Sequence, residues 1–285
     1  MLSSSSSSHS TSAASASHDI PVWFDSSNIW HRSIQYHPEQ PARIEACVKT
    51  LLEEQRARQQ DCTGGTRYQL RDVSPDRSTS YVHEEDKDDN NCGMMYQDPF
   101  SEIELQRALL IIKKTHDIPL VEKLERKCHD SKQRRINEGR PPLGFIGHLD
   151  EGDTYLTTES FDVCIRAAAT WIRAVDHVMS ISHASRQDDT DEGLEVVGRT
   201  TQPTKIIRPT AMALTRPPGH HATFDTPNGF CLFNFAATAI VYALDKYPDR
   251  IKKISVLDWD VHYGQGVSDI IERLQLTQVR YVSVH

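Results

Sequence analysis

Apolar residues along the chain follow two patterns, short continuous runs and longer stretches with a helical period. The continuous runs predict buried β-strands at residues 20–24, 211–215, 253–258 and 279–284. The helical spacing predicts helices at residues 41–60, 101–116, 160–179, 232–244 and 267–274. Because strands and helices alternate and the strands are apolar, we expect an α/β fold in which helices cover both faces of a parallel sheet.

Polar sequence interrupts this pattern in three places. Residues 1–18 are rich in serine and predict a disordered tail, which leaves residues 19–285 as one domain. Residues 61–100 and residues 184–204 are polar and irregular, so we expect them to be inserts on the surface of that domain.

Composition and charge narrow the class of protein. A chain of 285 residues that is 38% hydrophobic is long enough for one large core. Its 32 basic and 40 acidic residues give a net charge of −8, which argues against direct nucleic-acid binding and favours a basic peptide as partner. The longest apolar run, residues 235–244, is far shorter than the roughly 20 residues that span a bilayer, so we expect no membrane span.

The cysteines and the N-terminus bear on the compartment. None of the 6 cysteines forms a Cys-x-x-Cys pair, which favours reduced thiols in a reducing compartment. The first residues lack both the apolar core of a secretory signal and the arginines of a transit peptide. We therefore expect the nucleus, the cytoplasm or both, with organelle targeting as an open alternative.

Three polar residues follow one of the predicted strands at a spacing of two. Asp258, Asp260 and His262 would share one face if the strand stayed extended, at the sheet end where α/β proteins bind ligands. Two carboxylates and an imidazole suit a divalent metal and form a partial ligand set for catalytic zinc. The alternative is a solvated strand end with incidental charges.

Two adjacent histidines follow another predicted strand. His220 and His221 end the segment RPPGHH, and a neutral imidazole is the usual proton carrier for hydrolysis at a metal-activated water. A surface pair in a proline-rich turn is the alternative, but the nearby Asp and His motif favours the chemical interpretation.

Several segments, taken in order, resemble the zinc-dependent histone deacetylase family and the related acetylpolyamine amidohydrolases. The segments are HPEQPARI, EGDTYLTTESF, RPPGHHA, GFCLFNF, VLDWDVHYGQG and YVSVH. The resemblance implies an arginase/deacetylase-like three-layer α/β domain with a central parallel sheet.

The resemblance also implies roles in the reaction. Asp260 and His262 would ligate Zn²⁺, and Asp258 would orient His220. His221 would be the general base that takes a proton from the metal-activated water.

Further positions match the substrate channel and a second cation site. Gly229 and Phe230 would line a narrow channel for the acetyl-lysine side chain, and Asp153 would grip the substrate backbone at the rim. The positions that match a monovalent-cation site, expected to bind K⁺, are Asp258, Asp260, His262, Ser283 and Val284.

The chain departs from the family pattern at some positions. Tyr263 stands where a second histidine is common, and Phe235 replaces a frequent asparagine. Gln265 replaces the Asn or Asp that usually partners the second active-site histidine, and its extra methylene would shift the hydrogen bond to His221. The family draws a third zinc ligand and a tyrosine from segments after the YVSVH strand, so we expect the C-terminal part of the domain to be missing.

These observations lead to one principal hypothesis and two alternatives. The principal hypothesis is hydrolysis of the acetyl amide of N-acetyl-lysine in histones or other proteins, with corepressor-type complexes as candidate partners. One alternative keeps the chemistry but takes an acetylpolyamine as substrate. The other is a deacetylase-like interaction module without turnover.

Overall fold

A parallel sheet with the first strand at its centre forms one part of the structure. The computed structural model describes residues 19–33, 37–60, 67–75, 94–96, 99–149, 152–187 and 208–285. The sheet has the order β3-β2-β1-β6, with all its strands parallel. Its strands are β1 (Asp19–Phe24), β2 (Arg67–Asp72), β3 (Met94–Tyr96) and β6 (Met212–Leu214).

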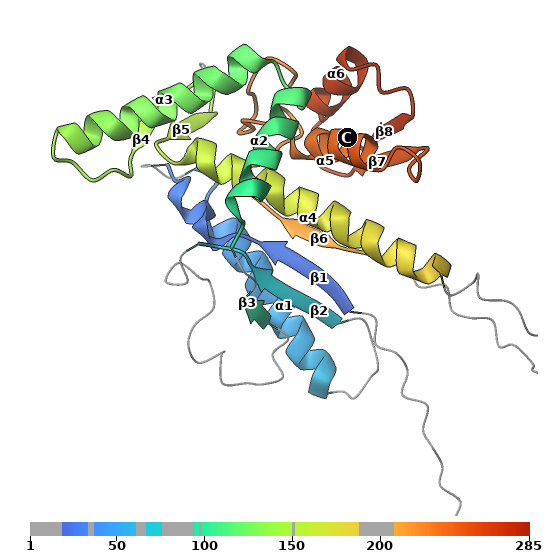
Figure 1. Ribbon diagram of the computed structural model, residues 1–285. Helices are drawn as coiled ribbons and strands as arrows, with labels where there is room; N and C mark the ends of the chain where they lie inside the picture. The colour runs from blue at the N-terminus through green and yellow to red at the C-terminus, as the bar shows by residue number, and fades with distance from the viewer. Residues whose placement is uncertain are drawn as a thin grey trace, which may run out of the picture.

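A second parallel pair carries the last predicted strands. β7 (Ile254–Asp258) pairs with β8 (Val279–Ser283), and α6 (Gln265–Arg273) connects them. Figure 1 shows this pair and α6 together at the C-terminal end of the molecule, next to α5 (Phe235–Lys246). The predicted α/β class with parallel strands is confirmed.

Helices cover both faces of the four-stranded sheet. The side chains of β1 alternate between the two faces, so apolar residues of this strand pack against helices on each side. Val22 and Phe24 pack with Ile44 and Val48 of α1 (Ala42–Gln60) on one face. Trp23 joins the larger core on the opposite face. The result is the expected arrangement of three layers.

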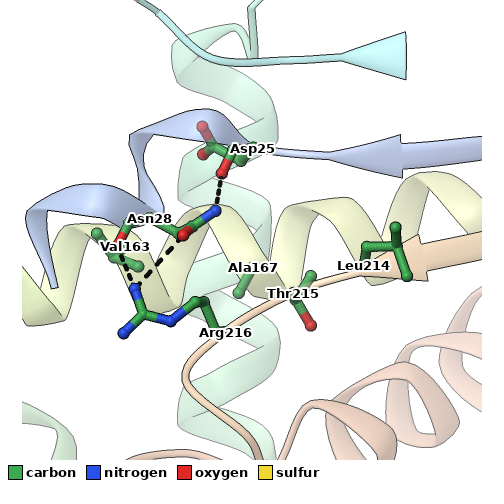
Figure 2. A pocket seen from close by; sticks show the side chains of 7 residues that line it. All are labelled: Asp25, Asn28, Val163, Ala167, Leu214, Thr215 and Arg216. Atoms are coloured by element: carbon green, nitrogen blue, oxygen red, sulfur yellow. Dashed lines mark hydrogen bonds between the residues drawn. The ribbon is translucent and has the colours of Figure 1, made fainter. Parts of the chain in front are cut away.

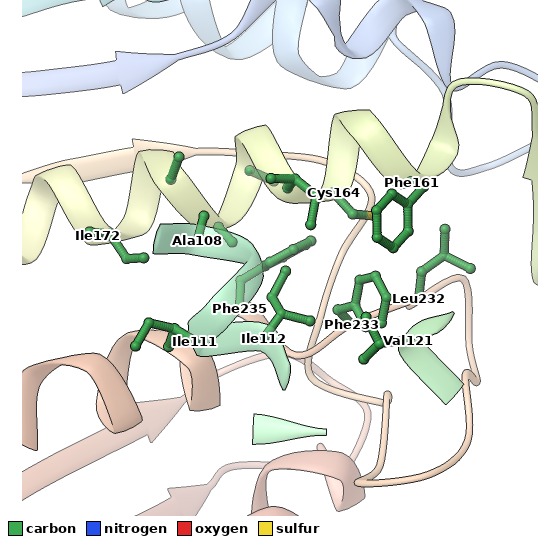
Figure 3. Close-up of a cluster of buried hydrophobic side chains, with 14 of the residues drawn as sticks. Ala108, Ile111, Ile112, Val121, Phe161, Cys164, Ile172, Leu232, Phe233 and Phe235 are labelled. Atoms are coloured by element: carbon green, nitrogen blue, oxygen red, sulfur yellow. The ribbon is translucent and has the colours of Figure 1, made fainter. Parts of the chain in front are cut away.

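The larger core lies between helices. α4 (Ser160–Gln187) contributes the largest share of its side chains, and α2 (Glu102–Thr115), α3 (Ile118–Asn137) and α5 contribute most of the others. Figure 3 shows Phe233 and Phe235 between the side chains of α2 and those of α4. Phe235 is 2% exposed. Its ring fills the core, which explains why this chain has a phenylalanine where an asparagine is frequent in the family.

Two stretches differ from the sequence expectation. Residues 61–100 were expected to form a polar loop, but β2 and β3 lie inside this range. Leu70 of β2 is fully buried against α1 and Tyr68 packs beside the same cluster, so two residues anchor a strand that is otherwise polar. α4 was expected to end near residue 179, but it continues to Gln187 into the range of the second expected insert.

Other elements were not predicted at all. α3 (Ile118–Asn137) follows α2 directly, and β4 (Phe145–His148) pairs antiparallel with β5 (Tyr155–Thr157). A 3-10 helix, η1 (Ser26–Trp30), follows β1. The serine tail at 1–18 and most of the two expected inserts lie outside the described residues. Within the described chain, no helix combines the length and the apolar character needed to cross a bilayer.

A buried ion pair connects the first and the later parts of the chain. Arg216 donates from Nε to Glu39 Oε1 at 2.6 Å and from Nη2 to Oε2 at 2.8 Å, and neither side chain is more than 3% exposed. Arg216 also donates to the carbonyl oxygens of Asn28 and His31. The loop that begins at Arg216 is therefore fixed against the segment after β1.

A small cavity lies beside this ion pair. Figure 2 shows Asn28 between Asp25 and Arg216 at its polar end, with Val163, Ala167 and Leu214 lining the apolar side. Its volume is about 10 Å³, which is room for one water molecule at most. The cavity is therefore a packing detail of the core and no ligand site.

Candidate functional site

The paired histidines lie beside the carboxyl end of β7. His220 Nδ1 lies 3.0 Å from Asp258 Oδ2, and Tyr281 of β8 donates its hydroxyl to the same oxygen at 2.8 Å. Burial raises the pKa of Asp258, but the hydrogen bonds from His220 and Tyr281 outweigh it and hold that pKa below its ordinary value. Because an ionised carboxylate only accepts, the hydrogen-bond network assigns the proton of His220 to Nδ1.

His221 has a different partner. Its Nδ1 lies 2.7 Å from Gln265 Oε1, at the first residue of α6. The longer glutamine side chain therefore makes the hydrogen bond that the sequence left in doubt. The amide oxygen accepts, so this network also assigns the proton to Nδ1 and leaves Nε2 as an acceptor. The two imidazole rings are 4.0 Å apart between centroids.

Glycine at position 264 allows this packing. A Cβ there would lie 2.5 Å from Asp258 Oδ2 and 2.3 Å from the hydroxyl oxygen of Tyr281. Both atoms belong to the hydrogen bonds just described, so any side chain at Gly264 would separate them.

Gly229 and Phe230 form the centre of a tight turn next to His221. The backbones of Asn228 and Cys231 exchange hydrogen bonds at 3.0 and 2.8 Å, and the two central residues have φ of 51° and 68°. Positive φ at both central positions is typical of turns that close two-residue hairpins. A Cβ on Gly229 would lie 2.4 Å from Cδ2 of His221, so the turn packs directly against the imidazole.

Asp153 is tied to the same turn. Its carbonyl oxygen accepts from His37 Nε2 at 3.0 Å, and the His37 ring packs against Phe230 with centroids 4.8 Å apart. The neighbouring Thr154 accepts from the backbone N–H of Phe230 at 3.2 Å. The structure thus connects the residues expected at the rim and in the channel through short contacts, while Asp153 itself is exposed.

Asp260 and His262 lie in a turn and not on an extended strand, because β7 ends at Asp258. The condition for all three side chains to share one strand face, an extended chain from Asp258 to His262, is therefore not met. Asp260 Oδ1 accepts from the backbone N–H of His262 at 2.8 Å and lies 2.9 Å from Nδ1 of that residue. The backbone hydrogen bond is the main cause that lowers the pKa of Asp260.

The donor chemistry of this turn fits part of a zinc shell. A carboxylate oxygen and an imidazole nitrogen are ordinary zinc ligands, and the side chains of Asp260 and His262 are 48% and 71% exposed. Catalytic zinc commonly has three protein ligands. Across the parts of the chain that the structure describes, no group of three or more His, Cys, Asp or Glu side chains is arranged to hold a metal ion.

The residues expected to hold potassium lie where β7 and β8 end. Asp258 is opposite Ser283 in the parallel register, and the backbone N–H of Val284 donates to the carbonyl oxygen of Asp258 at 2.9 Å. The Ser283 hydroxyl oxygen is buried, and the Tyr281 hydroxyl interacts with it. A buried hydroxyl oxygen beside the carboxyl end of β7 is a chemically suitable ligand for a monovalent cation, so Ser283 fits such a site.

Some of the residues that support the site could not be selected from sequence patterns. Tyr281 was visible only as part of an apolar strand, and His37 only as part of the HPEQPARI segment. His116 caps α2, and its ring joins the carbonyl oxygen of Thr223 at 2.9 Å to the backbone N–H of Asn234 at 2.9 Å. Such residues are recognised only from the three-dimensional structure, because their partners are far away in sequence.

Comparison with a solved structure supports the fold. The HDA15 HD domain superposes with a TM-score of 0.51 and 22% sequence identity, over 94% of this chain and 54% of that chain. The protein is therefore an arginase/deacetylase-like α/β domain. Its parallel strands are covered by helices, and the paired histidines lie at a strand end.

Comparison with known sequences identifies the family. Residues 37–285 match the model of the histone deacetylase domain, so the chain belongs to the histone deacetylase family. An uncharacterised Synechocystis protein, slr0245, is 32% identical over 159 residues, which are 56% of this chain and 42% of that protein. The polyamine deacetylase HDAC10 of Danio rerio is 46% identical over 74 residues, which are 26% of this chain and 10% of that protein. The chain thus covers less than half the length of these relatives.

Proposed function

We propose that the protein hydrolyses the acetyl amide of N-acetyl-lysine in histones or other proteins and releases acetate. The observation that carries this proposal is the pair of imidazoles with both Nδ1 atoms in hydrogen bonds, to Asp258 and to Gln265. This arrangement leaves the Nε2 atom of His221 available for proton exchange with a substrate, while Nε2 of His220 lies 4.0 Å from Asp260 Oδ1.

The two histidines have different partners and therefore different roles. His221 is the general base that accepts a proton from the attacking water at Nε2, while the Gln265 oxygen keeps its ring in the required tautomer. His220 is held by an ionised carboxylate, which stabilises positive charge on the ring as protons move in the site. His221 then returns the proton to the leaving lysine amine.

The turn at Gly229 and Phe230 supports the assignment of the channel. Phe230 offers an aromatic wall to the methylene groups of lysine, and Gly229 keeps the backbone close to His221. The exposed Asp153 carboxylate accepts hydrogen bonds from the backbone of a substrate at the rim.

Asp260 and His262 would hold the zinc ion, which when bound polarises the acetyl carbonyl and makes water a stronger acid. Asp258, Ser283 and Val284 would contribute to a potassium site, with the buried Ser283 hydroxyl oxygen opposite Asp258 as the supporting observation. Both cations would lie close to the carboxyl ends of β7 and β8.

The test compares His221→Ala with His262→Ala in the zinc-loaded protein. His221→Ala should lower turnover of an acetyl-lysine peptide about a hundredfold or more and leave the zinc content unchanged, because it removes only the base. His262→Ala should remove both zinc and turnover, because it deletes a ligand. His129→Ala, at an exposed position on α3, is the matched control. Full turnover in His221→Ala contradicts the proposed mechanism.

A second candidate substrate is an acetylated polyamine, because one relative is named a polyamine deacetylase. A panel that compares acetyl-lysine peptides with N-acetylputrescine and N-acetylspermidine separates the two. Higher kcat/KM for the polyamines would replace the first proposal with the second.

A further inference from the structure

Phe230 has a strained backbone that its surroundings hold in place. Its φ is 68°, in the left-handed region that bulky residues with a Cβ rarely adopt. Strain of this kind persists only where neighbouring contacts determine the conformation. The contacts here are the hydrogen bond from the Phe230 N–H to Thr154 Oγ1 at 3.2 Å and the edge-on packing of the His37 ring.

The His37 ring is itself fixed. His37 Nδ1 lies 3.1 Å from the backbone N–H nitrogen of Glu39 and 3.2 Å from the carbonyl oxygen of that residue, and Nε2 faces the Asp153 carbonyl oxygen, which only accepts, so Nε2 carries a proton. Nε2 then donates to the carbonyl oxygen of Asp153 at 3.0 Å. The aromatic ring of Tyr155 packs edge-on against the His37 ring with centroids 4.9 Å apart, and His37 is 7% exposed. One buried imidazole thus contacts both the main chain of Asp153 and the ring of Phe230.

We propose that His37 is a positioning residue that sets the distance between the rim carboxylate of Asp153 and the aromatic wall of Phe230, and so determines how peptide substrates are held. The inference rests on the proposed function, because that function assigns the rim and the channel. A peptide that contacts both places depends on their separation. A substrate without flanking residues uses only the channel and does not need the rim.

Three substitutions at His37 separate its contacts. His37→Ala removes the ring and both hydrogen bonds. His37→Gln places an amide N–H near the position of Nε2, from where it can donate to Asp153, but it offers Glu39 no acceptor at the position of Nδ1. His37→Asn places an oxygen near the position of Nδ1 for Glu39, but its side chain is too short to reach Asp153. His129→Ala again serves as the control for loss of a histidine.

The first measurement is hydrogen exchange of the Phe230 amide by NMR. In His37→Ala this amide should exchange about fivefold faster than in the wild type, because the turn loses the ring that packs against Phe230. The Asn234 amide, which donates to His116 and lies outside these contacts, should exchange at the wild-type rate.

The second measurement is the kinetics of two substrates, an acetyl-lysine peptide and N-acetyl-lysine amide without flanking residues. In His37→Ala and His37→Asn, KM for the peptide should rise about fivefold with kcat changed less than twofold, and KM for the small substrate should stay the same. His37→Gln should restore much of the peptide KM.

The outcomes distinguish this inference from the proposed function. A wild-type exchange rate for the Phe230 amide in His37→Ala overturns the positioning role, whatever the activity. Equal rises in KM for both substrates, or the same KM in His37→Gln and His37→Asn, also overturn it. If the wild-type protein hydrolyses neither substrate, the proposed function is wrong, and the exchange measurement still decides whether His37 positions the turn.

Discussion

At the scale of single residues, two positions of the site require glycine because the backbone there lies close to proposed catalytic side chains or their partners. Gly229 and Gly264 both lie where a Cβ would meet a proposed catalytic residue or its support. The sequence suggested Gly229 as part of a channel for substrate. The structure adds that any side chain there meets His221 first, so a substitution acts on the base as well as on the channel.

We predict that Gly229→Ala lowers turnover about a hundredfold, because the new Cβ would lie 2.4 Å from Cδ2 of His221 and would displace the ring. The measurements are peptide turnover and unfolding in urea. Gly139→Ala is the matched control, since Gly139 also has a positive φ, 68°, but a Cβ there meets nothing within 4 Å. Both variants should lose about 1 kcal/mol of stability from backbone strain. Equal turnover in the two variants would show that His221 does not depend on this contact.

At this scale, the sequence predicted those residues of the candidate site that belong to short motifs. His220, His221, Asp258 and Gln265 were named from their segments, and their pairing in space agrees with that assignment. Tyr281 and His37 were not predictable, because each acts through partners that no local spacing reveals. The turn of Asp260 and His262 was misjudged because alternation along a strand says nothing about where the strand ends.

At the scale of elements, α2 shows how one side chain can both begin a helix and join it to another. The Ser101 hydroxyl accepts from the Glu104 N–H, and Glu104 accepts from the Ser101 N–H at 2.9 Å. Glu104 also accepts from Arg173 of α4 at 2.8 and 3.0 Å. Burial of Glu104 raises its pKa, but these hydrogen bonds outweigh the effect and lower it to about 2.

Ser101→Ala should cost about 1 kcal/mol of unfolding free energy, because the capping box loses the acceptor for the Glu104 N–H. Urea unfolding measures the change. Ser180→Ala on α4 is the control, since that exposed hydroxyl only donates to a carbonyl oxygen of its own helix, and it should change stability by less than about 0.5 kcal/mol. A loss in Ser101→Ala no larger than in the control would contradict the role of the cap.

Prediction of elements from the sequence succeeded where apolar residues dominate and failed where they are few. The runs that became β1, β7 and β8 are apolar enough to be recognised alone. β2 has one fully buried apolar residue, Leu70, and is stabilised by the strands and helix beside it. α3 keeps its buried residues on one narrow stripe among many charged residues, so its period is weak in the sequence.

At the scale of the whole molecule, a buried neutral histidine makes stability depend on pH. Burial lowers the pKa of His116 from 6.5 to about 4, although its hydrogen bond to the Thr223 carbonyl opposes the shift. In the folded state Nε2 must stay unprotonated to accept from the Asn234 N–H. Between pH 4 and pH 6.5 the unfolded state therefore binds a proton at His116 that the folded state does not bind.

The unfolding free energy should fall by about 3 kcal/mol from this residue as pH decreases from 6.5 to 4, and it should be unaffected by His116 above pH 6.5. Urea unfolding at a series of pH values measures the slope. His116→Gln should be less stable at neutral pH but should show a shallower dependence on pH. A His116→Gln slope as steep as that of the wild type would contradict this prediction.

The buried pair of Glu39 and Arg216 also constrains the order of events during synthesis. The two residues are 177 positions apart, and β1 pairs with β6 across a similar distance. While the ribosome makes the chain at about 5–20 residues per second, Glu39 emerges many seconds before its arginine. A carboxylate cannot enter an apolar interior alone at acceptable cost, so the N-terminal layer cannot close on itself in that interval. Nascent chains stalled before residue 216 should therefore be sensitive to proteases over residues 19–60, and those stalled well beyond it should resist them.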